Sequence, residues 1–359
     1  MDKGKWLMIT TGVIIGCLAV MLVAMGNPAN MGFCIACFLR DTAGALGFHQ
    51  AKAVQYVRPE LIGMVLGAFI AAFSTGEFKG RGGSSTFVRF VLGIFMMIGA
   101  LVFLGCPLRD IIRMGGGDLN AVVGLAGFIG GILCGIYFLR QGFNLGASKS
   151  DNGSQAGAYI FILTVVGLLL MLVFRFNINP SGGGPLFFST AAPGSQHAPL
   201  WIALGAGLLV GVLAQRARLC LSGGFRDFFL IGEKGMLLAY AGIFLAVLVL
   251  NLYLGKFNLG FAGQPIAHTN HIFNFLGLFL VGQCAVLLGG CPLRQMILGS
   301  EGDMDAAATV VGMIAGAAIA HNFLLASSAK GTTNLGEIVL IGGIVIVSVI
   351  GWAYREVDA

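Results

Sequence analysis

The stretch Gly105-Cys106-Pro107-Leu108-Arg109 returns unchanged, 185 residues later, as Gly290-Cys291-Pro292-Leu293-Arg294. Two further pairs of matching stretches lie in the same order along the chain, at offsets of 185 and 186: Gly117-Asp118 with Gly302-Asp303, and 34–41 (CIACFLRD) with 220–227 (CLSGGFRD). Three ordered matches at offsets that agree within one residue are hard to explain by chance. We therefore interpret the chain as a tandem duplication.

The 359-residue chain is 57% hydrophobic, and only 10% of its residues are charged, against about 25% in ordinary soluble domains. Its mean hydropathy is +0.91. These values argue against a soluble enzyme, a nucleic-acid binder and a disordered linker. The net charge of +6 lies mostly in short loops between apolar runs, which is typical of a topology signal rather than of a nucleic-acid footprint. The composition predicts a polytopic protein of the lipid bilayer.

A membrane-spanning helix needs about 20 mostly apolar residues, and ten runs of the chain approach that length. They are 6–25, 57–74, 87–104, 120–139 and 157–175 in the first half, and 199–215, 236–254, 273–289, 306–325 and 335–354 in the second. The runs predict an all-α integral membrane protein with about ten transmembrane helices. An even number of spans puts both termini on one side, and the distribution of Lys and Arg favours the cytoplasmic side.

Each half of the duplication contains five spans, and an odd number makes the second copy enter the membrane in the opposite direction. The predicted organisation is two inverted five-helix repeats, 1–176 and 199–359, which a linker at 177–198 joins into one membrane domain. Inverted repeats occur in many transporters, whose sites lie near the midplane at the interface between repeats.

Short segments between the spans predict re-entrant half-helices. The segment 31–48 is too apolar for a free loop and, with Arg40 and Asp41, too short for another span. In each Gly-Cys-Pro-Leu-Arg segment the proline suits the first position of a short helix. Asp118 and Asp303 are expected to cap the helices that follow. We predict four half-helices, two on each side, that bring the cysteines of both halves toward one central point.

The repeated segments place thiols and arginines near helix N-termini. Free N–H groups and the positive end of the helix dipole suit an anion, and a thiol adds a weak donor with a soft, polarizable surface. The candidate substrate pathway consists of Cys34, Cys37, Cys106, Cys220 and Cys291. The residues expected to support the anion or to order the loops are Arg40, Arg109, Arg226, Arg294, Asp41 and Asp227. The pattern favours a small anion that carries sulfur or selenium; no catalytic group, metal or cofactor is predicted.

At several positions a purely structural role is an alternative to a role in the pathway. Cys17, Cys134 and Cys284 have no counterpart across the repeat and are interpreted as buried, small apolar residues. The Arg-Asp pairs 40–41 and 226–227 have the alternative role of pairing within themselves and holding the loops in shape. The spacing of His268 and His271 permits a metal pair, but a solvated loop is favoured.

Two alternatives to a sulfur-anion transporter stay open. Cys34 and Cys37 form a C-x-x-C, which also occurs in thiol–disulfide oxidoreductases, although the second half has Gly223 in place of Cys37. A structural scaffold leaves the repeated cysteines and arginines unexplained. The chain has no G-x-x-x-x-G-K-[ST] motif, so transport would be passive, ion-coupled or driven by a partner.

At these residues the chain resembles the YeeE/YedE family of sulfur-transport membrane proteins. The stretch 32–41, both Gly-Cys-Pro-Leu-Arg segments, and Arg218-Leu219-Cys220 with 225–227 carry the resemblance, which covers nearly the whole chain. Within the family the chain is most similar to the selenium-transport branch, through 26–32 and the C-x-x-C.

The resemblance implies an hourglass of inverted repeats in the bacterial inner membrane, and uptake of thiosulfate or a related sulfur or selenium compound. It implies that Cys34, Cys106 and Cys291 hand the substrate along by S–H···S contacts, with Cys220 as the repeat counterpart of Cys34. It also implies a small TusA-like sulfur-carrier protein as a cytoplasmic partner. Cys37 is a departure that gives the first segment an extra thiol.

Overall fold

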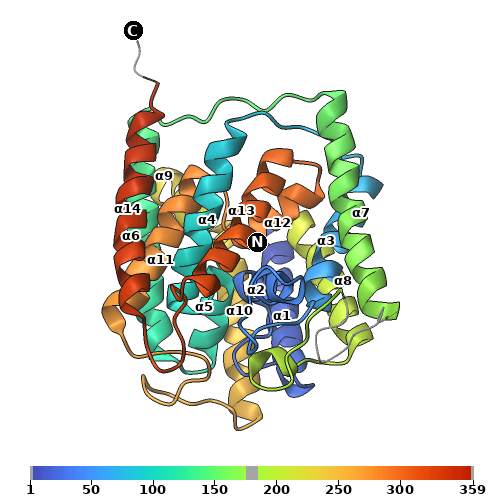
Figure 1. The fold of residues 1–359 in the computed structure, drawn as a ribbon, viewed down its shortest axis with the longest axis vertical. Coiled ribbons are helices and arrows are strands. Elements are labelled where there is room, and N and C mark those ends of the chain that lie inside the picture. Colours follow the sequence, from blue (N-terminus) through green and yellow to red (C-terminus); the bar gives the residue numbers. More distant parts are fainter. Residues whose placement is uncertain (1–2, 175–184, 357–359) are drawn as a thin grey trace.

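The computed structural model describes residues 3–174 and 185–356, and their regular secondary structure is helical (Figure 1). The first half contains α1 (Lys3–Ala24), α2 (Ile35–Ala45), α3 (Pro59–Ser74), α4 (Thr86–Phe103), α5 (Pro107–Gly115), α6 (Leu119–Arg140) and α7 (Asn152–Phe174). After a 3₁₀ turn, η1 (Pro193–Ser195), the second half contains α8 (Leu200–Arg216), α9 (Leu221–Ile231), α10 (Gly235–Tyr253), α11 (His271–Leu287), α12 (Pro292–Ser300), α13 (Met304–Asn322) and α14 (Asn334–Ala353).

The prediction of an all-α, multi-pass membrane protein is confirmed. Within the described ranges, nine helical segments are long and apolar enough to cross a membrane. The tenth predicted span corresponds to α3, which is apolar but has only 16 residues. Three of the nine segments are broken helices, because α4 with α5, α8 with α9, and α11 with α12 each follow one another with only a short break.

The four predicted half-helices are α2, α5, α9 and α12, which have 9 to 11 residues each. Pro107 and Pro292 occupy the start of α5 and α12, as expected, because a proline there loses no helical hydrogen bond. Asp118 and Asp303 cap α6 and α13 through their side chains, which confirms that prediction. In Figure 1, α2 and α5 lie in the lower part of the molecule, and their counterparts α9 and α12 lie in the upper part.

The two halves pack against each other through helix pairs that each take one helix from each half. α1 packs on α10 and α3 on α8, while α4 packs on α13 and α6 on α11. Glycines bring these backbones close together: a Cβ on Gly12 would lie 1.9 Å from the carbonyl oxygen of Ala239, and one on Gly207 would lie 2.3 Å from that of Glu60. Such close approach is the usual role of glycine between membrane helices.

The first part of the predicted linker, 177–184, lies outside the described residues. The rest of it packs on the first half rather than bridging open space. The backbone N–H of Phe187 donates to the carbonyl of Ala45 at 2.8 Å, and that of Gly194 donates to Ala53 at 2.8 Å. The Ala198 N–H donates to the Asn27 side chain at 2.8 Å. This part of the linker therefore belongs structurally to the first half.

Candidate functional site

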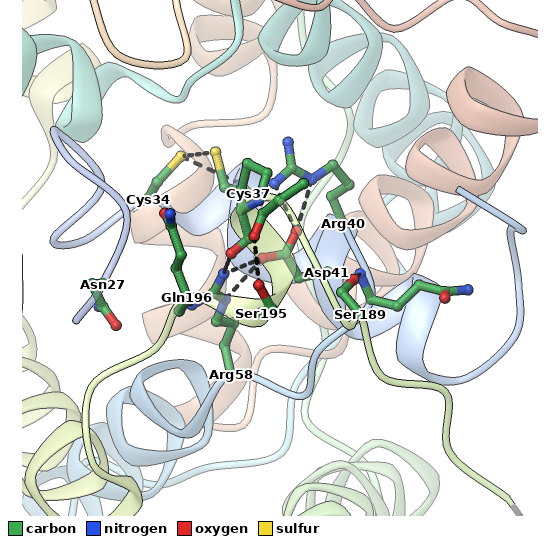
Figure 2. Close-up of polar contacts among 12 residues, drawn as sticks. Asn27, Cys34, Cys37, Arg40, Asp41, Arg58, Ser189, Ser195 and Gln196 are labelled. Carbon is green, nitrogen blue, oxygen red and sulfur yellow. Dashed lines mark hydrogen bonds and ion pairs between the residues drawn. The ribbon is translucent and has the colours of Figure 1, made fainter. Parts of the chain in front are cut away.

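Three buried thiols of the first half gather where α2 and α5 begin. Cys34 is the N-cap of α2, and its sulfur accepts a hydrogen bond from the backbone N–H of Cys37 at 3.3 Å. The Cys34 and Cys37 sulfurs are 2.8 Å apart (Figure 2). Cys106 is the N-cap of α5, and its side chain contacts that of Cys34. Two helix N-termini thus present three thiols to one place.

The second half repeats this arrangement with two thiols and a hydroxyl. Cys220 is the N-cap of α9 and accepts from the backbone N–H of Gly223 at 3.3 Å. Cys291 is the N-cap of α12, and its backbone N–H donates to the Cys220 sulfur at 3.5 Å. The Ser222 hydroxyl lies 3.1 Å from the same sulfur. Four of the five predicted pathway cysteines are therefore N-caps of half-helices.

The two thiol clusters meet at α10, which packs on both α5 and α9. Tyr240 on α10 is only 3% exposed, and it lies within electrostatic range of Cys106, Cys220 and Cys291. Sequence reasoning missed this residue, because within the apolar run 236–254 it looks like one more core aromatic side chain.

Arg40 and Asp41 form a buried ion pair, with 2.7 Å between Arg40 Nη2 and Asp41 Oδ1. The second carboxylate oxygen accepts from Arg58 Nε at 2.8 Å (Figure 2). The other Arg58 nitrogens donate to the carbonyls of Gln196, at 3.0 Å, and Pro193, at 3.1 Å. This geometry matches the loop-ordering alternative for Arg40 and Asp41. The sequence analysis missed Arg58, although an arginine at the edge of an apolar run is itself a signal.

The repeated arginines behave differently in the two halves. Arg109 donates to the carbonyls of Asn30, at 3.0 Å, and Ile266, at 3.3 Å, and its Nη1 lies 3.7 Å from the Cys37 sulfur. Arg294, its repeat counterpart, instead pairs with Glu301 at 3.2 Å. Arg109 is therefore a cation beside the first thiol cluster.

The Arg226–Asp227 pair of the second half forms as the loop-ordering alternative expects, with 2.8 Å between the charged atoms. It differs from its counterpart in solvent contact, because its side chains are 32% and 27% exposed.

A second buried charge cluster in α5 was also missed. Arg113 pairs with Asp118 at 2.7 Å, and both side chains are wholly buried. Asp110 is 0% exposed, and within the described part of the chain neither of its carboxylate oxygens has a hydrogen-bond partner. The offset of 185 puts Gln295 and Leu298 at the equivalent places. Comparing the residues after the two Pro-Leu-Arg segments would have found this difference.

Two lesser predictions need correction. Cys284 is buried and Cys134 half-buried, as expected, but Cys17 is exposed on the outside of α1, so its predicted burial is wrong. His268 does not lie in a solvated loop: it is 2% exposed, and its Nε2 lies 2.8 Å from the Val102 carbonyl oxygen. The segment before α11 folds back onto the end of α4, while His271 is exposed as expected.

No group of three His, Cys, Asp or Glu side chains among the described residues is arranged to hold a metal ion. Burial lowers the pKa of His49 and of His268, both of which precede a helix in loops outside the spanning segments. These two rings therefore act as neutral hydrogen-bonding groups near pH 7.

The fold and the site define a multi-pass helical membrane protein with buried thiols at the helix ends where its halves meet. A sequence model described as "Sulphur transport" matches residues 1–108 and 216–349, more than half of the chain. The chain therefore belongs to the YeeE/YedE sulphur transport family, and the resemblance seen in its motifs is confirmed. A search of curated proteins gave no match.

Proposed function

We propose that this chain carries a small sulfur- or selenium-containing anion, with thiosulfate as the first candidate, across the bacterial inner membrane. The observation that carries the proposal is the position of Cys34, Cys106, Cys220 and Cys291, which are the N-caps of four half-helices drawn from both halves. An anion moving between the halves would meet a thiol and a helix N-terminus at each step.

The proposed pathway depends on thiols and helix ends more than on charged side chains. Arg40, Arg226 and Arg294 each have a carboxylate partner, so they are poorly placed to bind a substrate anion. Arg109 is the exception, because its partners are backbone carbonyls and the Cys37 sulfur. Weak S–H donors without strong countercharges would let a soft anion enter and leave readily.

The proposed membrane orientation follows from the duplication. The halves, 1–176 and 199–359, would be inverted repeats with both termini in the cytoplasm, so that α2 and α5 enter from outside and α9 and α12 from inside. The opposite placement of these half-helices in Figure 1 supports the inversion of the two halves. The cytoplasmic position of the termini rests on the distribution of Lys and Arg alone. A TusA-like sulfur carrier would then receive the substrate beside α9 and α12.

Uptake measurements test the proposal. Cells that lack other sulfur importers would express the wild type, Cys291→Ala or Cys37→Ala, and receive labelled thiosulfate with and without competing selenium compounds. We expect Cys291→Ala to abolish uptake and Cys37→Ala to retain it. Cys284→Ala is the matched control, because Cys284 is buried seven residues earlier on the same broken helix but is no N-cap. Failure of the wild type to import any sulfur or selenium compound would contradict the proposal.

A thiol–disulfide oxidoreductase is the second candidate, and the 2.8 Å between the Cys34 and Cys37 sulfurs is the observation that favours it. An oxidoreductase requires both of these thiols and tolerates the loss of Cys291. The same set of variants therefore separates the two functions: equal loss in Cys34→Ala and Cys37→Ala, with Cys291→Ala unaffected, would favour redox chemistry.

A further inference from the structure

Tyr240 combines deep burial with an unused polar group. Tyr240 is only 3% exposed, and its hydroxyl has no hydrogen-bond partner within the described parts of the chain. Leaving a buried hydroxyl without a partner costs about 1–3 kcal/mol. A side chain that keeps such a group at the meeting point of two thiol clusters is a candidate for binding something that passes there.

The Tyr240 hydroxyl approaches the Leu221 backbone at the beginning of α9. The Cys291 side chain faces the same backbone. Within an α-helix the first N–H groups have no partner inside the helix, and the helix dipole makes this end positive. In α9 the Gly223 N–H already donates to the Cys220 sulfur, so the available groups are those of Leu221 and Ser222. α9 has 11 residues, enough for a developed dipole. One small region therefore contains a hydroxyl donor, a positive helix end and two thiols.

We propose that the Tyr240 hydroxyl and the first N–H groups of α9, beside the Cys220 and Cys291 thiols, bind the oxygen end of a sulfur oxyanion. Thiosulfate has a soft terminal sulfur and three oxygens. The thiols suit the sulfur, whereas the hydroxyl and the N–H groups are stronger donors that suit the oxygens. The inference rests on the proposed transport function and names the substrate class of its second thiol cluster.

The first half has no equivalent hydroxyl at the corresponding position. Gly12 of α1 faces Ala239, and Gly207 of α8 faces Glu60 in the mirrored helix pair. The residue after Ala239 is Tyr240, and the residue after Glu60 is Leu61. The oxyanion site therefore exists once, at the second cluster, and it makes that cluster selective for anions that carry oxygen.

Binding of thiosulfate and of hydrosulfide, which has no oxygen, to the purified full-length protein under reducing conditions tests the site. Tyr240→Phe removes only the hydroxyl, so we expect the Kd for thiosulfate to rise about tenfold or more, as for a lost hydrogen bond to a charged group. The Kd for hydrosulfide should not change. Tyr137→Phe, at a half-exposed tyrosine of α6, is the matched control.

Two results would refute the oxyanion site. In the first, Tyr240→Phe binds thiosulfate as tightly as the wild type. In the second, Tyr240→Phe loses affinity for thiosulfate and hydrosulfide equally, which indicates a structural role. Thiosulfate uptake by the wild type reconstituted in liposomes separates this inference from the transport function. Uptake by the wild type with unchanged binding by Tyr240→Phe would refute the oxyanion site alone. A wild type that neither binds nor imports thiosulfate would refute both.

Discussion

The thiol clusters of the two halves have the same backbone arrangement, but the charged residues beside them are buried to different degrees. Cys34 and Cys220 both cap a half-helix and both accept from the backbone N–H three residues on, at 3.3 Å. Asp41 lies between two arginines with no exposure, whereas its counterpart Asp227 pairs with one and is 27% exposed. The thiols at helix ends are thus what the halves share, whereas the ion pair at Asp41 is fully buried and its counterpart at Asp227 is partly exposed.

Neutralising the two equivalent aspartates should give the largest contrast between the halves. Asp41→Asn leaves two buried guanidinium groups without their carboxylate, so we expect a loss of about 3–5 kcal/mol. Asp227→Asn breaks a partly exposed pair and should cost at most about 1 kcal/mol. Thermal unfolding of the detergent-purified variants measures both. Equal midpoints for the two variants would show that the buried pair does not distinguish the halves.

The close packing of α1 on α10 and of α3 on α8, by contrast, should be equally sensitive to an added methyl group in both pairs. A methyl group added by Gly12→Ala or Gly207→Ala would collide with a backbone carbonyl of the partner helix. We expect each variant to lose about 1–3 kcal/mol, as for overpacking in a dense core. Gly205→Ala on α8 is the control, because a Cβ there meets no atom within 4 Å. A large loss of stability in only one of the two variants would show that the two helix pairs are not packed equivalently.

Exchanging the one thiol that differs between the clusters should have a small effect on stability. A Cβ at Gly223 would lie 3.4 Å from the Cys220 Cβ, in ordinary contact, so Gly223→Cys should change stability by less than about 1 kcal/mol. The variant builds a second C-x-x-C. Peptide mapping by mass spectrometry after mild oxidation and alkylation should find a disulfide between Cys220 and the new thiol that the wild type lacks. Cys37→Gly should lose the disulfide between Cys34 and Cys37. Absence of a disulfide between Cys220 and the new thiol, with the one between Cys34 and Cys37 present, would mean that the two helix ends are not equivalent.

The smallest expected effect is a dependence of stability on pH. Burial lowers the pKa of His49 in the folded protein, and the Arg40 charge lowers it further. As the pH falls below about 6.5, the unfolded chain therefore takes up the proton first, and the stability of the fold declines. His49→Gln should flatten the decline of the unfolding midpoint between pH 7 and pH 5. A steeper decline in this variant would contradict the assignment, and exposed His271→Gln is the control.

Local signals in the sequence predicted most of the helices and their ends. Apolar length predicted the spans, and the prolines and aspartates at helix starts predicted α5, α12 and the caps of α6 and α13, since these depend on neighbouring residues only. Pro107 and Pro292 placed Cys106 and Cys291 directly before their half-helices, whereas the sequence placed Cys34 and Cys220 only near helix N-termini.

What the sequence did not predict depends on contacts between distant segments. Asp41 and Arg58 are 17 residues apart, and the carbonyls that complete the Arg58 shell come from the linker. Tyr240 becomes distinctive only when α10 is packed on α5 and α9. His268 is buried because the loop before α11 packs against the end of α4. A loop this short has no hydrophobic periodicity from which that contact could be predicted.

The linker contacts also set an order for biogenesis. Gln196 follows Arg58 by 138 residues, and chains are synthesised from the N-terminus at about 5–20 residues per second. For several seconds after α3 has been made, the Arg58 guanidinium therefore lacks two of its final acceptors. The first half therefore completes its polar contacts only after the linker that follows α7 has been made.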